Sequence, residues 1–468
     1  MTAILWLRRD LRRADHPALL AAREAATASG GDLVVAFVVD PRLWDGGGAA
    51  RRAWLAATLK TTDEAYDGAL TLLHGNPRTV IPELASRVGA TSVHVSRETT
   101  PAGRRRDEVV AGALRSAGVE WVETGTPYAV GPGLVVNGSG DPYKVFTPFS
   151  KAWRAHGWPV PAPTPRVLPL RRVDSDPRAT AEVTAALEAP GLPELPPAGE
   201  KAALARWREW RERALTAYAD DRNRPDLDGT SRLSPYLKLG VVHPRTLLAE
   251  LAGESGKGAH TYESELAWRE FYADVLWHHP RTAWEDLRPE MSAMRYDEPQ
   301  DAIEAWKAGR TGYPIVDAGM RQLWATGWMH NRVRMIAASF LIKHLLIDWR
   351  VGEQWFWDTL VDADYAERGQ LAVGGGQRGR RQHVRADHGP AHPVRKVRCG
   401  GLYSPMGAGA GPSWDSGHPR SRCEWRAAHR ISAEDHRSSD GARAGSRRTR
   451  PYKRLIALAR ALLQNCDS

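Results

Sequence analysis

The sequence predicts an α/β domain with a parallel, Rossmann-like sheet, followed by an all-helical domain. Three observations carry this prediction. Short apolar runs alternate with helical patterns over residues 1–130, which is typical of a parallel sheet covered on both faces. A Pro-rich connector lies within 131–200. From 201 to 366 the apolar residues recur about every 3.6 positions almost throughout, which indicates helices.

Each element of the first domain follows from its own pattern. Buried strands are expected at AILWL, DLVVAFVVD, TSVHVS and VEWVET, and amphipathic helices at HPALLAAREAATAS and RTVIPELASRVGA. Ligands of such sheets bind at the carboxyl ends of the strands, so this edge is a candidate site. No GxGxxG follows the first strand, and a dinucleotide fingerprint is therefore absent there.

The connector and the second domain follow in the same way. The connector includes WPVPAPTPRVLPLRR and EAPGLPELPPAGE, which predict a long surface crossing. Helices are expected at EKAALARWREWRERALTAYADD, YESELAWREFYADVLWHH, PQDAIEAWKAGR, DAGMRQLWATGW and HNRVRMIAASFLIKHLLIDW. All three cysteines lie beyond Ala366, which excludes disulfides and cysteine metal sites from the preceding body.

The net charge of +10 belongs to the end of the chain. Residues 367–450 hold 17 Lys and Arg against 7 Asp and Glu, so the rest is balanced and its charge does not itself indicate a nucleic-acid partner. Of the 19 Trp, 17 precede residue 367, which suits cores, stacking and electron transfer. No apolar stretch reaches the roughly eighteen residues of a membrane span, and MTAILWLRRDLRR lacks a signal-peptide pattern, so we expect a cytoplasmic protein.

The first chemical constellation is DGTSRLSPYLKLG, residues 228–240. Thr230, Ser231 and Ser234 surround Arg232 just before a helical run. Hydroxyls, free backbone N–H groups and a guanidinium at a helix start form an anion site that suits a pyrophosphate. An ordinary capped helix explains the same residues.

The second constellation is YESELAWREFYADVLWHHP. Glu265, Trp268 and Tyr272 share one helix face, where a carboxylate beside an indole can hydrogen-bond a base while the ring stacks on it. A core Trp beside a solvated Glu is the alternative interpretation.

The third constellation lies in GYPIVDAGMRQLWATGWMHNRVRM and the residues after it. Asn331, Arg334 and Met335 are spaced for one helix face. A buried Arg334 needs a carboxylate, and either Asp362 or Asp364 could supply it across helices. Taken singly, residues of these types are usually structural.

Together these stretches resemble the DNA photolyase/cryptochrome family, colinearly from residue 1 to about 366. The resemblance is carried by ILWLRRDLRRADHPAL, YKVFTPFSKAW, DGTSRLSPYLKLGVVHPR, ELAWREFY, GYPIVDAGMRQL, TGWMHNRVRM and LLIDWRVGEQWFWDTLVDADYA. MHNRVRM resembles the class I cyclobutane pyrimidine dimer photolyases, whereas cryptochromes and (6-4) photolyases tend to show paired His here. The resemblance implies light-driven repair of these dimers in UV-damaged DNA by electron transfer from reduced FAD.

The resemblance also implies site residues. FAD would be bound by Tyr218, Thr230, Ser231, Arg232, Leu233, Ser234, Arg269, Asn331, Asp362 and Asp364. The flipped dimer and its DNA would contact Glu265, Trp268, Asn331, Arg332 and Met335. Trp349 and Tyr296 would be the middle and outer groups of an electron-transfer chain. We further expect an antenna chromophore, either a deazaflavin or methenyltetrahydrofolate, on the first domain, no metal, and a monomer.

After Ala366 the sequence loses its apolar pattern. The family continues DADYA with a segment like NNAASWQWVAGSG, whereas RGQLAVGGGQR stands at 368–378. One permitted codon choice for it, read one base later, gives AASWQWVAGS, and 397–411 and 433–441 hide similar matches in the same phase. We therefore expect a frameshift near residue 367, in the gene or in its sequencing, and a 367–450 segment that is not natively folded. A natural basic tail that binds DNA phosphates is the alternative.

A frameshift would remove part of the site. The family's Asn facing flavin N5 falls at Arg368, its inner indole at Ala372 and a second pocket Trp at Gly374. We expect this chain to bind FAD weakly and to repair poorly. A cryptochrome-like blue-light receptor and an inactive gene product remain the alternative functions.

Overall fold

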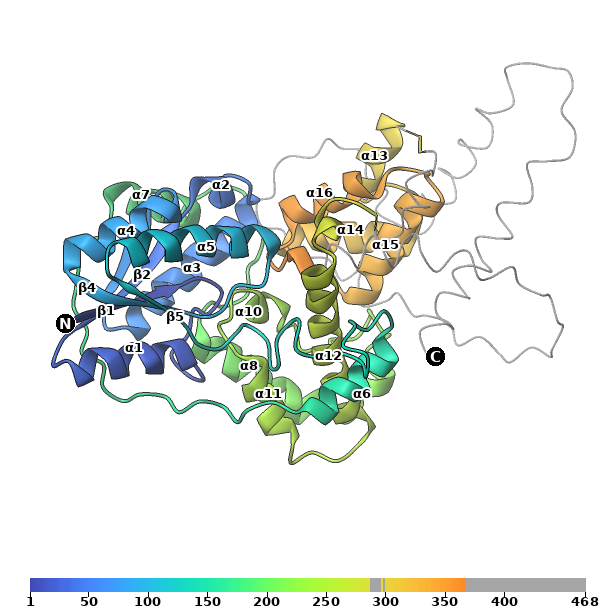
Figure 1. Cartoon of the computed structure of the whole chain (residues 1–468). Coiled ribbons are helices and arrows are strands. Elements are labelled where there is room, and N and C mark those ends of the chain that lie inside the picture. Colours follow the sequence, from blue (N-terminus) through green and yellow to red (C-terminus); the bar gives the residue numbers. More distant parts are fainter. Residues whose placement is uncertain (287–295, 298, 367–468) are drawn as a thin grey trace, which may run out of the picture. The chain divides into compact units, whose positions relative to one another are not determined.

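A computed structural model describes residues 1–286, 296–297 and 299–366 (Figure 1). All of these residues belong to one compact unit, Met1–Gly407. The predictions for 367–468, including the frameshifted segment, lie outside the described residues.

A five-stranded parallel sheet forms the core of the first domain. Its order is β3-β2-β1-β4-β5, so the strand order reverses between β1 and β4. The strands are β1 (Thr2–Leu7), β2 (Leu33–Val39), β3 (Leu70–His74), β4 (Ala90–Val95) and β5 (Glu120–Glu123). The four strands expected from the sequence are confirmed, and β3, which is only five residues long, was missed.

Helices cover both faces of this sheet (Figure 1). They are α1 (Pro17–Ala28), α2 (Pro41–Trp44), α3 (Ala49–Ala65), α4 (Pro77–Val88) and α5 (Pro101–Ser116). Successive residues of β1 enter different cores, because side chains alternate across a strand. Leu5 and Leu7 pack with Leu19 of α1, whereas Trp6 packs with Leu84 of α4 and Leu114 of α5.

The segment expected to be a connector contains two helices, α6 (Phe146–His156) and α7 (Pro177–Leu187). Ala179 and Val183 of α7 are buried in the core that α1 and α3 share with the sheet. Leu170 forms a β-bridge with Leu33. The connector is therefore packed along the first domain for part of its length.

The second domain is helical throughout its described part. Its elements are α8 (Glu200–Ala214), α9 (Tyr218–Asp221), α10 (Ser234–Lys238), α11 (Pro244–Leu251), α12 (Lys257–His278), the 3₁₀ helix η1 (Pro280–Ala283), α13 (Gln300–Lys307), α14 (Pro314–Thr326), α15 (Asn331–Lys343) and α16 (Trp349–Thr359). Helices α13–α16 enclose a separate core that includes Trp306 and Phe356. The predicted fold class, an α/β domain followed by a helical domain, is confirmed.

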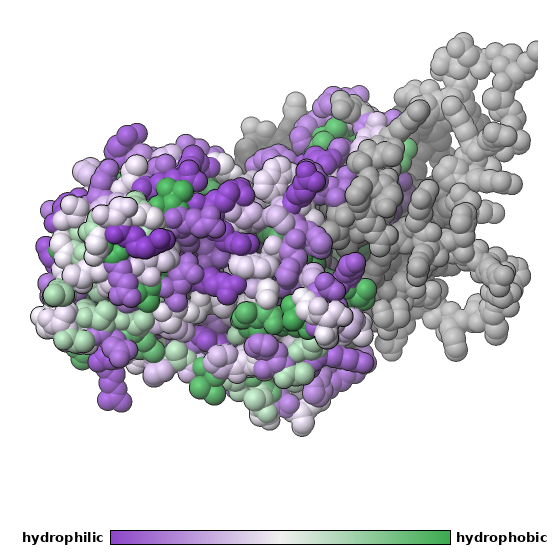
Figure 2. All heavy atoms as spheres, in the orientation of Figure 1, coloured by the Kyte–Doolittle hydropathy of each residue, from purple (hydrophilic) through white to green (hydrophobic). Residues whose placement is uncertain are grey.

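Buried polar groups join the two domains. Asp15 accepts a hydrogen bond from Arg245 Nη2 at 2.6 Å, and Arg12 donates to the carbonyl of Gly240 at 2.8 Å. Glu270 of α12 accepts from the backbone N–H groups of residues 129–131, the shortest of these bonds being 2.5 Å. Among the described residues, no helix is long and apolar enough to cross a membrane. On the face in Figure 2, hydrophobic residues form small groups among hydrophilic ones.

Candidate functional site

The segment 230–234 turns sharply just before α10. Arg232 has φ 53°, a left-handed conformation that is uncommon for a residue with a side chain, and Leu233 follows in the right-handed region at φ −85°, ψ −3°. Alternation of left- and right-handed residues is typical of a nest, in which successive backbone N–H groups point to one side and can bind an anion. We refer to residues 230–234 as the nest. Within it, Leu233 N–H makes only a long hydrogen bond, 3.4 Å, to Ser231 Oγ. The pyrophosphate site at these residues stays a prediction, with which this backbone conformation is compatible.

An aromatic and hydroxyl cluster lies beside this nest. Ser231 Oγ is 3.0 Å from the Tyr262 hydroxyl. Tyr218 is buried and packs edge-on against Tyr262 and Trp210, with centroid distances of 5.5 and 5.1 Å. Burial raises the pKa of Tyr218 well above its usual range, with further contributions from Glu265 and Tyr262. The Tyr218 hydroxyl therefore stays protonated at neutral pH and can donate a hydrogen bond.

Asp362 connects the nest with α15. Arg334 binds it through both nitrogens, at 3.0 and 2.7 Å, and Ser234 Oγ donates to it at 2.5 Å. Of the two carboxylates that the sequence offered to Arg334, the structure selects Asp362. A bidentate pair with a third donor fixes the carboxylate in one orientation.

Asp364 pairs with different cations. It forms ion pairs with Arg9, which follows β1, and with Lys238 at 3.4 Å. Burial alone would raise the pKa of Asp364, but Arg9, Lys238 and Arg269 outweigh this effect and hold it below its usual range. Sequence reasoning missed both partners. Arg9 lies in the opening motif of the other domain, and Lys238 was not singled out within DGTSRLSPYLKLG.

Trp328 and His330 also belong to this group, although the sequence analysis did not single them out. Trp328 Nε1 donates to Ser234 Oγ at 3.3 Å, and the Arg232 guanidinium lies 4.9 Å from the centre of its ring. His330 is the N-cap of α15, where its Nδ1 accepts the Arg332 N–H at 3.1 Å. The only signal was their position inside TGWMHNRVRM.

The residues predicted to face DNA lie on α12 and α15. Glu265 forms a 2.7 Å ion pair with Arg222. Trp268 and Tyr272 share a face as expected, with centroids 5.5 Å apart, but Phe146 of α6 stacks on Trp268 at 3.6 Å. Because Phe146 and Tyr272 both stack on this indole, the structure also agrees with the alternative interpretation of Trp268 as a core residue.

On α15, Asn331 is exposed and Arg332 is tied by its neighbours. Arg332 Nε donates to Asn223 at 2.5 Å, and its Nη1 lies 3.4 Å from the sulfur of Met335. Arg269 of α12 donates to the carbonyls of Pro127 and Leu237, at 3.0 and 3.1 Å. Arg269 thus links the two domains.

Trp349 and Tyr296 pack together with Ile342 in a small cluster of their own. Trp349 is buried, and its Nε1 donates to Asp286 at 3.0 Å. Arg350 lies 4.7 Å from the centre of the Trp349 ring. The two predicted electron carriers are therefore neighbours, in a cluster separate from the nest and Asp362.

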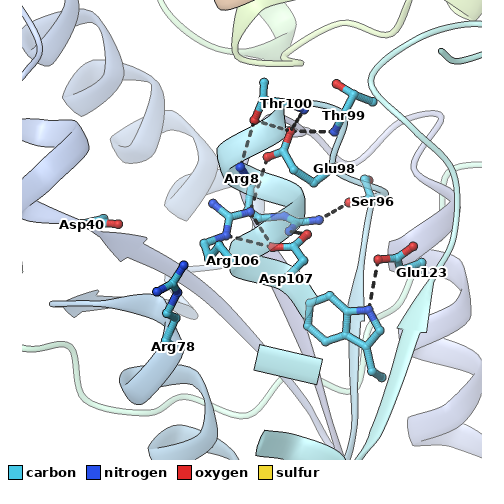
Figure 3. A network of polar contacts seen from close by, with 12 residues as sticks. Arg8, Asp40, Arg78, Ser96, Glu98, Thr99, Thr100, Arg106, Asp107 and Glu123 are labelled. Carbon is cyan, nitrogen blue, oxygen red and sulfur yellow. Dashed lines mark hydrogen bonds and ion pairs between the residues drawn. The ribbon is translucent and has the colours of Figure 1, made fainter. Parts of the chain in front are cut away.

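The carboxyl edge of the sheet holds a second polar group at the point where the strand order reverses (Figure 3). Arg8 pairs with Asp107, and Arg106 pairs with both Asp107 and Glu98. A small hollow adjoins this network, and its lining includes Arg9 and Glu98. The sequence predicted a candidate site at this edge, and the structure fills much of the edge with ion pairs.

Comparison with known proteins gives the following matches. A family model described as DNA photolyase matches residues 3–167, and one described as FAD binding domain of DNA photolyase matches residues 262–377. A deoxyribodipyrimidine photo-lyase of Synechococcus sp. is 39% identical over 387 residues, which cover 78% of this chain and 78% of that protein.

Solved structures match over a similar share. A bacterial class III photolyase from Agrobacterium tumefaciens is 33% identical, with a TM-score of 0.72 and 80% of each chain covered. An archaeal photolyase from Sulfolobus tokodaii is 25% identical, with a TM-score of 0.68 and coverage of 81% of this chain and 85% of the other. That structure contains two FAD molecules, with the implication of a novel light-harvesting cofactor.

Proposed function

Because the chain belongs to the DNA photolyase/cryptochrome family, we propose that it is a deoxyribodipyrimidine photo-lyase, which repairs cyclobutane pyrimidine dimers in UV-damaged DNA. The observation that carries the proposal is one assembled site. The nest at 230–234, Trp328 and the Arg334–Asp362 pair are linked by hydrogen bonds through Ser234. The assignment to class I stays a prediction.

The residues of this site fit FAD. The nest at 230–234 offers N–H donors to a pyrophosphate, and the hydroxyls of Ser231 and Tyr262 lie beside it. Asp362, fixed by Arg334, would accept a hydrogen bond from a ring N–H of the cofactor. Tyr218, Thr230, Leu233, Arg269, Asn331 and Asp364 complete the proposed binding set. Reduced flavin, excited by blue light, supplies the electron that splits the dimer.

The DNA-facing residues would receive the extruded lesion. A damaged base pair leaves the stack at a lower cost than an intact one. Glu265 would hydrogen-bond the dimer after exchanging its Arg222 partner, and Trp268 would offer an edge to it, since its faces are stacked on Phe146 and Tyr272. Asn331, Arg332 and Met335 would line the same side.

Trp349 and Tyr296 would carry electrons from the surface toward the cofactor. The Asp286 carboxylate accepts the Trp349 N–H, so an acceptor for the indole proton is already in place if Trp349 is oxidised. In this chain the position of the inner indole falls at Ala372, outside the described residues. We therefore expect slow photoreduction.

An antenna chromophore, a deazaflavin or methenyltetrahydrofolate, is a finer proposal that rests on family membership and on the second cofactor of the archaeal structure. The hollow at the sheet edge does not fit either ring system as its side chains stand. Its cavity volume of about 10 Å³ is far below the ~300 Å³ at which ligand pockets begin. Cytoplasmic location and a monomeric state also remain proposals.

The frameshift proposal is supported by the extent of the matches, which cover 78% of this chain and 78% of the Synechococcus protein. One experiment tests the frameshift proposal and the photo-lyase assignment. The chain and a version with the frame restored after Ala366 are purified, and bound flavin and light-dependent repair of a thymine-dimer oligonucleotide are measured for each. We expect full flavin and repair only in the restored version. Tight, stoichiometric FAD in the unrestored chain would contradict the expectation that this chain binds FAD weakly. A flavin-loaded restored chain without repair would contradict the photo-lyase assignment.

A further inference from the structure

Two helices of the second domain begin with a histidine N-cap whose two ring nitrogens have separate tasks. His243 caps α11 and His330 caps α15, and in each the Nδ1 accepts a backbone N–H at 3.1 Å, from Arg245 and Arg332 respectively. A neutral imidazole that accepts at Nδ1 carries its proton on Nε2. Both histidines therefore present an Nε2–H donor away from the helix.

The two Nε2–H groups differ in what they meet. That of His243 donates to the carbonyl of Thr126 at 2.9 Å. His330 is buried, with an exposed fraction of 3%, and its Nε2 has no hydrogen-bond partner among the described residues. A buried donor without an acceptor costs about 1–3 kcal/mol, and such groups are rare in folded proteins. The site around His330 thus lacks an acceptor.

The neighbours of His330 belong to the proposed cofactor site. Its ring lies edge-on to Trp328, which donates to Ser234 beside the nest. Burial, together with Arg332, Arg334 and Arg232, lowers the pKa of His330 to about 4, so the ring is neutral at pH 7. Three guanidinium groups nearby favour an electron-rich or anionic acceptor over a second donor.

We propose that His330 is a cofactor-positioning residue whose Nε2–H donates a hydrogen bond to an acceptor atom of bound FAD. The inference rests on the proposed function, since it needs FAD in this site. It assigns two roles to one ring, because Nδ1 holds the start of α15 while Nε2 holds the cofactor. The helix that carries Asn331, Arg332 and Met335 would then be fixed relative to the cofactor.

The variants His330→Asn and His330→Ser separate these two roles. Asn and Ser are both good N-caps, so the start of α15 is kept while the Nε2–H is lost. The matched control is His243→Asn, which likewise keeps a cap and loses an Nε2–H, but one that is already satisfied by Thr126. The measurements, made on the chain and on its frame-restored version, are the FAD dissociation constant by titration and thermal unfolding without flavin.

We expect both His330 variants to bind FAD about tenfold more weakly than the parent chain, because one hydrogen bond to the cofactor is lost. Their flavin-free unfolding temperature should be unchanged or higher, since a buried unpaired donor has gone. His243→Asn should show the reverse pattern, with a lower unfolding temperature and an unchanged dissociation constant.

The failures are distinguishable. If the parent chain binds FAD and the His330 variants bind it equally well, or if they lose only flavin-free stability, the inference is overturned while the FAD site stands. If neither the parent chain nor the frame-restored version binds FAD, the proposed function fails and the inference fails with it.

Discussion

The sheet edge and the 230–234 region both gather arginine side chains, but they satisfy polar groups differently. At the sheet edge, Arg8 pairs with Asp107, and Arg106 pairs with Glu98. Burial raises the pKa of Glu98, but these arginines outweigh burial and lower it to about 2. In the helical domain, a nest and a buried His330 N–H are left without strong acceptors. The comparison teaches that polar groups of the first region satisfy one another, whereas the second leaves donors that the proposed FAD could satisfy.

The largest effect is expected from Asp364→Ala, which breaks a buried ion pair between the two domains. Asp364 is buried and is the carboxylate partner of Arg9. Removal of one member of a buried ion pair leaves the other charge uncompensated, which costs about 3–5 kcal/mol. We expect the free energy of unfolding in urea to fall by this amount.

The control for Asp364→Ala is Glu285→Ala, because Glu285 pairs with Arg281 at the surface. An exposed pair contributes about 0–1 kcal/mol. Equal losses in the two variants would show that the Arg9–Asp364 pair adds nothing beyond a surface pair.

Gly240→Ala should have the next largest effect, at the junction between the two regions. Gly240 has φ +64°, and a Cβ there would lie 1.9 Å from the backbone oxygen of Arg9. Left-handed backbone and a backbone clash together should cost about 3 kcal/mol. Gly253→Ala is the matched control, because Gly253 has open space around it and no positive φ. Similar unfolding temperatures for the two variants would contradict a close approach of Arg9 to Gly240.

Acid should lower the free energy of unfolding by an intermediate amount, through two buried histidines near the contact between the domains. Burial lowers the pKa values of His16 and His243 to about 4, against about 6.5 in an unfolded chain. The unfolded state then binds more protons, so stability is full above pH 6.5 and is lost as the pH falls toward 4. Each histidine should cost about 2 kcal/mol at pH 5.

The acid effect is checked by urea unfolding between pH 8 and pH 5. His243→Asn should make the dependence on pH shallower, because one of the two groups no longer titrates. A slope that does not change in this variant would mean that His243 is not buried as a neutral ring. Burial raises the pKa of Asp15, but the Ala162 N–H and the Arg245 guanidinium help to lower it to about 2, so Asp15 should not titrate in this range.

The sequence predicted helices and strands better than it predicted contacts between distant side chains. Buried strands and long amphipathic helices carry their pattern locally, so β1, β2, β4, β5 and α12 were predicted. Arg334 was predicted to need a carboxylate, but only the fold selects Asp362 over Asp364. The Arg9–Asp364 pair and the stacking of Phe146 on Trp268 join residues more than 100 positions apart, and no local pattern encodes such contacts.

The smallest effect is expected at Arg232. Two variants there test whether residues 230–234 bind FAD through their backbone N–H groups or through the Arg232 side chain. Arg232→Gly keeps the left-handed conformation at no steric cost and should change the FAD dissociation constant by less than about threefold. Arg232→Val should weaken binding about tenfold, since a β-branched residue strongly disfavours positive φ and would flatten the nest. Both variants lose the same guanidinium, whose exposed pair with Asp228 contributes little. If both weaken binding equally, the side chain carries the contact with FAD and the nest does not.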